Sequence, residues 1–185
     1  MMNATAVRDP ELVKTGRYKR ILLATEGRPI PQSAVDRVIE LAADSGASVH
    51  VFSIARVHGV AFGLPNPGLL PTKREWDEQR AIVDKAAKRL RRKGIDADGH
   101  VLGTRKATKR ICDEAEREGC EAIVMAADPD RNRVVADMMW TQEPQRVRRR
   151  AKVPVILVPD EDQQAKAKAK AKAKAKAKAK AKAKR

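Results

Sequence analysis

Residues 20–31, RILLATEGRPIP, contain the pattern that decides the fold class. The apolar run at residues 20–25 predicts a short buried strand, which the loop at residues 26–29 ends. Pro31 fits the first turn of a helix, because its φ is already fixed and it has no N–H to satisfy. A weaker capping box at residues 33–36 offers an alternative start two residues later. A buried strand that leads directly into a helix is typical of an α/β sheet.

The same alternation of strand and helix continues to residue 159. Apolar residues at helical spacing predict that the first helix ends before Gly46, and a capping box of Thr72 and Glu75 begins the longest helix. Further strands are predicted at residues 47–56, 96–102, 121–127 and 153–159, and further helices at residues 72–93, 106–118 and from Thr141 onward. Prolines place the last strand at an edge of the sheet.

Two segments do not fit this alternation. Residues 59–71 hold three prolines and three glycines and are predicted to be irregular. Residues 128–140 are predicted to form a loop, with or without a short helix. Together the elements predict one α/β domain at residues 18–160, after an extension at residues 1–17 and before a tail at residues 161–185.

The predicted fold class is a five-stranded parallel sheet with helices on both faces, of the Rossmann-like kind. Such sheets bind ligands beyond the carboxyl ends of their strands, where the strand order reverses. In this chain those ends carry residues 26–28, the region after Ile54, residues 103–104 and residues 128–131. Any small-molecule site is therefore expected there.

The order of these pieces resembles the universal stress protein family over roughly residues 18–159. The resemblance depends on ILLAT followed by Glu-Gly-Arg at residues 26–28, on EAIVMA at residues 121–126, and on RVRRRAKVPVILVP at residues 146–159. It implies the same five-stranded parallel fold. It also implies a homodimer formed by pairing the last strands, which would cover an apolar edge that is otherwise an aggregation hazard.

Many members of that family bind ATP through a Gly-x-x-Gly, nine residues and Gly-Ser or Gly-Thr pattern, whose backbone N–H groups contact phosphates. Here the four patterned positions carry Asp128, Arg131, Thr141 and Gln142, and none is glycine. The acidic residue after the first strand is glutamate where the family usually has aspartate. The family-equivalent cofactor-binding positions are Glu26, Gly27, Arg28, Ile54, Asp128, Arg131, Thr141 and Gln142.

The substitutions at these positions predict that ATP binding is weak or absent and that the protein has no cofactor. Three alternatives stay open. The altered loop binds nothing, or Arg28, Arg131 and Lys106 gather around another anion, or the chain is a signalling member that still binds ATP.

No pattern of catalytic or metal-binding residues is visible in the sequence. There is no Ser-His-Asp order and no P-loop, and the three histidines at 50, 58 and 100 are scattered, so no catalysis and no metal are predicted. Cys112 and Cys120 are expected to be reduced and partly buried thiols, as in a cytoplasmic protein. No apolar run approaches the ~20 residues of a membrane span, and the first residues lack the apolar segment of a secretory signal.

The last residues form a polycation. Residues 165–184 are ten Ala-Lys pairs followed by Arg185, and they hold 11 of the 40 Lys and Arg residues. The remaining 29 basic residues exceed the 24 acidic residues by only five, so the body is only mildly basic. Like charges lie all round any helix that this tail could form, which predicts an extended, disordered segment.

A cationic tail of this kind suggests nonspecific binding to the phosphates of DNA or RNA. The residues concerned are Lys166, Lys168, Lys170, Lys172, Lys174, Lys176, Lys178, Lys180, Lys182, Lys184 and Arg185. Base-specific contacts are not expected, because the tail has no aromatic residue to stack on bases. Anionic membrane, polyphosphate and a purely solubilising repeat are the alternatives. The leading hypothesis is thus a non-catalytic, dimeric, stress-type protein, with nucleic-acid binding through the tail as the second.

Overall fold

The computed structural model describes residues 18–56, 60–61, 64–65, 70–127 and 143–160. Its elements, in chain order, are β1 (Arg20–Thr25), α2 (Gln32–Ser45), β2 (Ser48–Arg56), β3 (Val60–Ala61), β4 (Leu64–Pro65), α3 (Lys73–Arg92), β5 (Ala97–Thr104), α4 (Ala107–Arg117), β6 (Ala122–Ala127), α5 (Glu143–Arg150) and β7 (Val155–Pro159). Five strands form a parallel sheet in the order β5-β2-β1-β6-β7. The predicted fold class is confirmed, and β7 is an edge strand as predicted.

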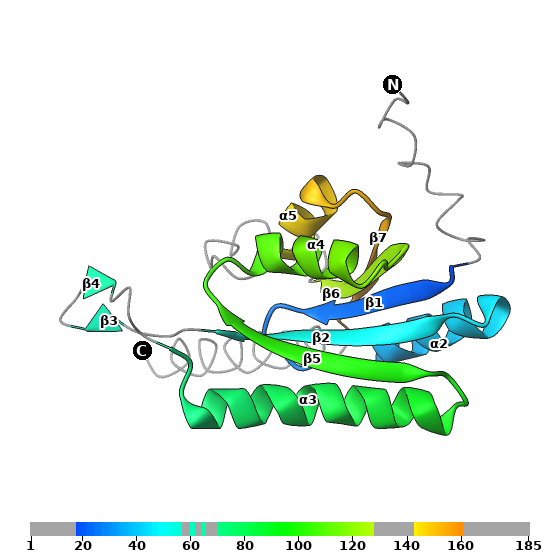
Figure 1. Ribbon diagram of the computed structural model, residues 1–185, viewed down its shortest axis with the longest axis horizontal. Helices are drawn as coiled ribbons and strands as arrows, with labels where there is room; N and C mark the ends of the chain where they lie inside the picture. The colour runs from blue at the N-terminus through cyan, green and yellow to red at the C-terminus, as the bar shows by residue number, and fades with distance from the viewer. Residues whose placement is uncertain (1–17, 57–59, 62–63, 66–69, 128–142, 161–185) are drawn as a thin grey trace, which may run out of the picture.

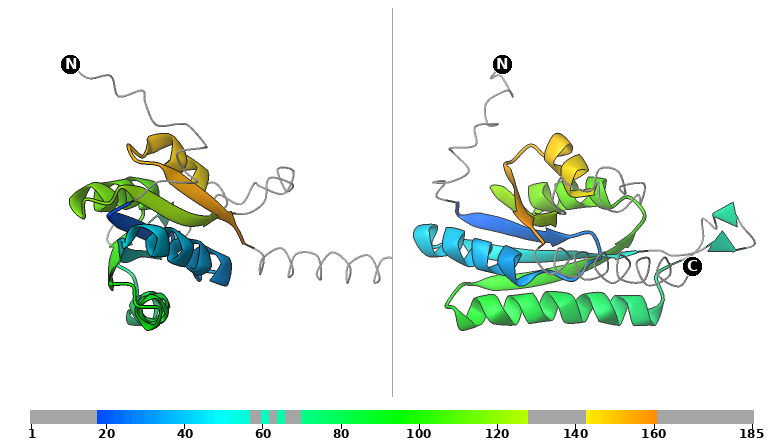
Figure 2. Two further views of the ribbon diagram at one scale, coloured as in Figure 1. Left: turned by 90° about the vertical axis from the view of Figure 1, so that its right-hand side faces the viewer. Right: turned by 180° about the vertical axis from the view of Figure 1, so that it is seen from behind.

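The helices lie on both faces of the sheet, with α2 and α3 on one face and α4 and α5 on the other (Figure 1 and Figure 2). Side chains of a strand alternate between the faces. Ile21 and Leu23 of β1 therefore pack in the core beneath α2 and α3, while Leu22 and Ala24 pack beneath α4 and α5. All four are buried, since β1 lies at the centre of the sheet.

The helix boundaries follow the capping signals closely. Thr72 and Glu75 form the predicted capping box at the start of α3, with the Thr72 side chain accepting a bond from the Glu75 backbone N–H. Gly46 ends α2 in the left-handed conformation, at φ 67°. The alternative start at residues 33–36 is wrong, because α2 begins at Gln32 with Pro31 as its N-cap and without a side-chain capping bond.

One predicted irregular segment contains a little regular structure. Residues 59–71 were expected to have none, but β3 and β4 pair there as a short antiparallel ribbon, with Val60 opposite Pro65 and Ala61 opposite Leu64. That prediction is wrong for these four residues. A ribbon of two residues per strand needs so few backbone bonds that Pro65, which has no N–H, fits at its end.

Several predicted segments lie outside the described residues. These are the extension at residues 1–17, the loop at residues 128–140, Thr141 at the expected start of the last helix, and the tail from residue 161 onward. Within the described part, α5 begins at Glu143 and accommodates Pro144 in its first turn. In this same part of the chain, every helix is too short or too polar to cross a lipid bilayer.

Candidate functional site

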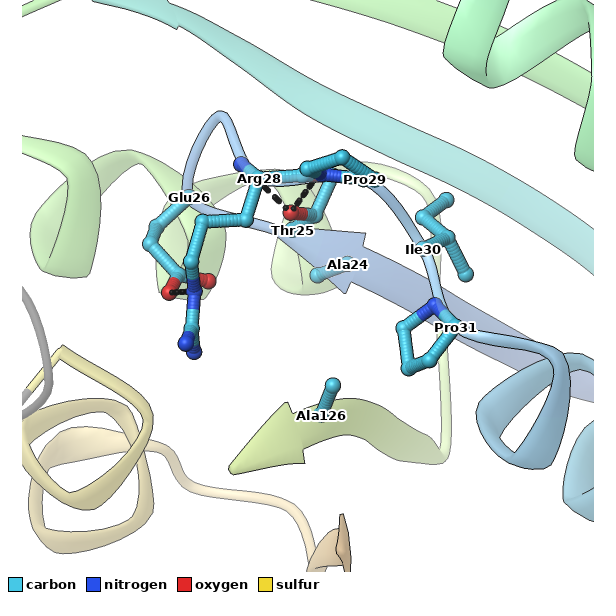
Figure 3. A pocket seen from close by; sticks show the side chains of 8 residues that line it. All are labelled: Ala24, Thr25, Glu26, Arg28, Pro29, Ile30, Pro31 and Ala126. Carbon is cyan, nitrogen blue, oxygen red and sulfur yellow. Dashed lines mark hydrogen bonds and ion pairs between the residues drawn. The ribbon is translucent and has the colours of Figure 1, made fainter. Parts of the chain in front are cut away.

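A hollow lies at the carboxyl ends of β1 and β6, at the centre of the sheet. The chain runs from β1 to β2 and β5 on one side, and returns to β6 and β7 on the other, so the strand order reverses at this point. Parallel sheets bind ligands at such a reversal. The hollow has about 200 Å³, part of it open to solvent (Figure 3). Its lining residues are Ala24, Thr25, Glu26, Arg28, Pro29, Ile30, Pro31 and Ala126.

The turn after β1 is held tightly by its own residues. The Thr25 hydroxyl donates to the Arg28 carbonyl oxygen at 2.7 Å and accepts from the Arg28 backbone N–H at 3.1 Å. Gly27 has φ 101°, and a Cβ at this position would lie 2.7 Å from the carbonyl oxygen of Ile54. Glycine is therefore required here both for its backbone conformation and for the close approach of β2.

Helix α3 fixes the same turn from the other side. The buried side chain of Gln79 donates to the Gly27 carbonyl oxygen at 3.2 Å and accepts from the Ser53 hydroxyl at 2.5 Å. These bonds join the turn to β2 and α3. A ligand in the hollow would meet a preformed wall on this side.

The side chains of Glu26 and Arg28 line the hollow and pair with each other. Figure 3 shows them side by side, pointing from the turn into the space between β1 and α5. The Arg28 Nε–H donates to the Glu26 carboxylate at 2.5 Å, and only 2% of the Glu26 side chain is exposed. Burial raises the pKa of Glu26, although the positive charges of Arg28 and Arg56 oppose this shift.

Arg56, at the carboxyl end of β2, belongs to the same site. Its Nε–H donates to the carbonyl oxygen of Glu26. Burial lowers the pKa of Arg56, while the negative charges of Glu26 and Glu143 act in the opposite direction. A network of opposite charges, supplied by the turn after β1, by β2 and by α5, thus lies at and beside the hollow.

The structure brings four of the predicted site residues together: Glu26, Gly27, Arg28 and Ile54. The other four (Asp128, Arg131, Thr141 and Gln142) lie outside the described residues. Arg131 is also a member of the suggested alternative anion site. Arg56 was missed by the sequence prediction. Its signal was its place at the end of a strand, which becomes informative only once β2 is known to lie beside β1.

The histidines are scattered in the sequence, but the structure brings two of them together. His50 of β2 and His100 of β5 both approach the same carboxylate oxygen of Glu114, on α4, at 3.0 Å. These side chains meet because β2 and β5 are neighbouring strands and both rings lie on the same face of the sheet. The spacing of the histidines along the sequence reveals neither the strand order nor the face. Burial would raise the pKa of Glu114, but hydrogen bonds from Arg117, His100 and His50 lower it overall.

The two cysteines behave as expected. Cys112 and Cys120 are buried free thiols. Burial raises the pKa of both, and that of Cys120 to about 11. Such thiols are poor nucleophiles at neutral pH.

Comparison of the chain with known proteins finds one family. The model of the Universal stress protein family matches residues 17–159. A universal stress family protein from Burkholderia pseudomallei shares 24% identity, with a TM-score of 0.56, over 78% of this chain and 98% of its own. Among curated proteins, none is significantly similar to this chain.

Two further solved structures have the same fold and carry nucleotides. The universal stress protein from Archaeoglobus fulgidus in complex with dAMP is 20% identical, with a TM-score of 0.55, over 77% of this chain and 98% of its own. A universal stress protein in complex with cAMP is 18% identical, with a TM-score of 0.56, over 78% of this chain and 99% of its own.

Proposed function

Since the chain belongs to the universal stress protein family, we propose that it is a non-catalytic, cytoplasmic stress-response protein in which ATP binding is weak or absent. The observation that carries this proposal is the ion pair of Glu26 and Arg28, which both line the hollow. Relatives of the same fold bind dAMP and cAMP. In this chain a buried ion pair borders the place where the strand order reverses and a ligand is expected.

The ion pair disfavours a nucleotide. Glu26 and Arg28 both line the hollow and are bonded to each other, so a phosphate that recruited Arg28 would draw it away from Glu26. Because Glu26 is 2% exposed, separating the pair would leave a buried carboxylate without its main partner, at a cost of roughly 3–5 kcal/mol.

Calorimetric titration of the full chain with ATP and Mg²⁺ tests the proposal. The expected result is no saturable binding at micromolar nucleotide. A dissociation constant in the micromolar range would overturn it.

A double variant tests whether the ion pair is the reason. Glu26→Asp with Arg28→Ser places the aspartate usual in the family after β1, shortens the acid and removes the guanidinium. We expect it to bind AMP at least about tenfold more tightly than the parent chain, which corresponds to about 1.4 kcal/mol. Arg80→Ser, on the exposed side of α3, is the matched control and should change nothing. Equal AMP affinity in parent and double variant would refute this role for the ion pair.

Nucleic-acid binding through the tail is the second candidate function, favoured by the 11 positive charges of residues 165–185 and by the lack of acidic residues in that stretch. Full-length protein should retard duplex DNA at low salt, whereas a chain ending at Asp162 should not. If about half of the charges engage phosphates, log K should fall with log salt at a slope near −5. Equal retardation by both chains would remove this candidate.

Dimerisation through β7 completes the proposal. Pro154 accepts a bond from the Ile123 N–H, and Asp160 donates to Ala127, so the even-numbered residues of the last strand direct their backbone groups toward β6. The backbone groups of Val155 and Leu157 therefore point away from the sheet. An antiparallel pairing of two copies at this edge would give each of these groups a partner.

A further inference from the structure

A group of polar side chains lies between the sheet and α4, apart from the ligand hollow. His50 comes from β2, His100 from the neighbouring strand β5, and Glu114 from α4, which covers this face. His50 is 4% exposed and Glu114 is 5% exposed. We propose that these three residues bind a divalent transition-metal ion of the zinc type. The proposal goes beyond the proposed function and does not depend on it.

The positions of the candidate ligand atoms suit such an ion. Nε2 of His50 and Nδ1 of His100 each lie 3.0 Å from Oε1 of Glu114, and the ligand atoms all lie within 4.8 Å of one another. Tetrahedral zinc with bonds of roughly 2.0–2.1 Å separates its ligand atoms by about 3.3 Å. The two nitrogen–oxygen separations therefore lie within a few tenths of an ångström of those that the ion requires.

The residue types also match a known set. Two histidines and one glutamate are the protein ligands of one class of zinc site, which leaves the fourth position to water. Neither cysteine is needed as a ligand in this site, and within the described residues Cys112 and Cys120 both belong to the apolar core. His100, with 42% of its side chain exposed, is the ligand of this set that lies nearest to solvent.

Asp98 provides the support that a metal-binding histidine usually has. Its Oδ1 lies 2.5 Å from Nδ1 of His50, so the ring is held with Nε2 toward Glu114. Arg20 in turn donates to Asp98 at 3.0 Å and to Glu118 at 2.8 Å. A carboxylate on the second nitrogen fixes the orientation of a ligating histidine.

The charges around the group also favour a cation. Both nitrogens of His50 face carboxylate oxygens, those of Asp98 and Glu114, so negative charge lies on two sides of the ring. Arg117 supplies a positive charge here, with its Nη2 2.6 Å from Oε1 of Glu114. Because 58% of the Arg117 side chain is exposed, it can swing into water at little cost when a metal ion takes its place.

Zinc titration of the full chain in competition with a chromophoric chelator tests the proposal. After treatment with a strong chelator and dialysis, we expect one Zn²⁺ per chain with a dissociation constant of about 1 µM or tighter, corresponding to about −8 kcal/mol. Co²⁺ in the same position should show the absorption of a tetrahedral site. A dissociation constant weaker than about 10 µM, tenfold above the expected value, would overturn the proposal. The cluster would then be an ion-pair network.

Three variants separate a ligand role from a structural one. His100→Ala removes a ligand that is 42% exposed and should leave the fold intact, as checked by circular dichroism, while zinc affinity falls at least about 100-fold. Asp98→Asn should weaken binding by about 10–100-fold, because it loosens the His50 ring. Glu116→Gln, on the same helix α4 and with 50% of its side chain exposed, is the matched control and should bind like the parent chain. Unchanged affinity in His100→Ala would refute the site.

Discussion

At the scale of single residues, Glu26 has the most consequences for function. It stands where the family usually has aspartate, and its longer side chain reaches the Arg28 guanidinium inside the hollow. Gly27 beside it was predicted as part of the site, and the close approach of Ile54 explains why glycine is needed. The sequence was sufficient to find these two residues because they follow a strongly apolar strand.

The buried carboxyl of Glu26 predicts a specific pH dependence of stability. Burial raises its pKa above the ordinary value of 4.5, so its contribution is most favourable below that value and is lost as the pH rises through the folded-state pKa. Glu26→Gln removes this titration. The free energy of unfolding of the variant, relative to the parent chain, should therefore rise as the pH increases above about 4.5.

Urea unfolding at several pH values between about 4.5 and 7.5 measures this difference. Glu78→Gln, which removes an acid that is 53% exposed, is the control and should show no comparable trend. A relative stability of Glu26→Gln that stays flat or falls with pH would show that burial does not dominate at this carboxyl.

At the scale of elements, local signals predicted most boundaries correctly. The apolar runs gave β1, β2 and β6 within a residue or two, and Gly46 and Thr72 marked a helix end and a helix start. Two-residue strands such as β3 and β4 carry too little periodicity to be recognised. The failure of the capping box at residues 33–36 shows that a backbone start at Pro31 can prevail over a weak side-chain signal.

The capping box of α3 should contribute measurably to stability. The Thr72 hydroxyl accepts from the Glu75 N–H at 3.3 Å, and the Glu75 carboxylate accepts from the Thr72 N–H at 2.6 Å. Thr72→Ala should lower the free energy of unfolding by about 1 kcal/mol, whereas Thr72→Ser, which keeps the hydroxyl, should change it by less than half of that. Chemical denaturation of the three chains measures both values. Equal losses in the two variants would mean that the hydroxyl does not act as a cap.

The packing of α3 on β5 depends on a glycine. A Cβ at Gly99 would lie 2.3 Å from Cγ1 of Val83 and 3.2 Å from the carbonyl oxygen of Val51. Val83 is buried and, as a β-branched residue, has few rotamers to escape into. Gly99→Ala should therefore destabilise the protein by roughly 1–3 kcal/mol.

A double variant shows whether this contact is the cause. Val83→Ala removes the clashing methyl group, so Gly99→Ala should cost less in that background, with a coupling of roughly 0.5–3 kcal/mol. The measurement is the unfolding free energy of the two single variants, the double variant and the parent. If the changes in unfolding free energy of the two single variants simply add in the double variant, the contact with Val83 is not the cause of the loss in Gly99→Ala.

At the scale of the whole molecule, strand order is what the sequence could not supply. Alternating strands and helices predicted a parallel sheet, but not that β2 lies between β1 and β5. That order places His50 opposite Asp98 and two pairs away from His100, on the same face of the sheet, and it brings Arg56 beside the turn after β1. Both groups depend on contacts between residues far apart in sequence, which no local pattern encodes.

The exposed edge of β7 leads to a prediction about assembly. Val155 and Leu157 direct their backbone groups outward, while Pro159 has no N–H to offer. In an antiparallel pairing centred on Ile156, Val155 would lie opposite Leu157 of the partner subunit, and the two copies would exchange four backbone hydrogen bonds. Proline is tolerated at an edge position whose N–H faces outward, so Val155→Pro should leave the sheet intact.

The same substitution should weaken the dimer. It removes two of the four intersubunit bonds, and at roughly 0.5–1.5 kcal/mol for each bond the dissociation constant should rise about 5-fold to 150-fold. Val155→Ala keeps the N–H and loses the same branched side chain, so it separates the backbone effect from the loss of apolar contact. Sedimentation at a series of concentrations, with melting temperature as the check on folding, compares the two. If both variants dimerise equally well, the copies do not meet through the backbone of β7, and an apolar contact between side chains or another surface must hold any dimer together.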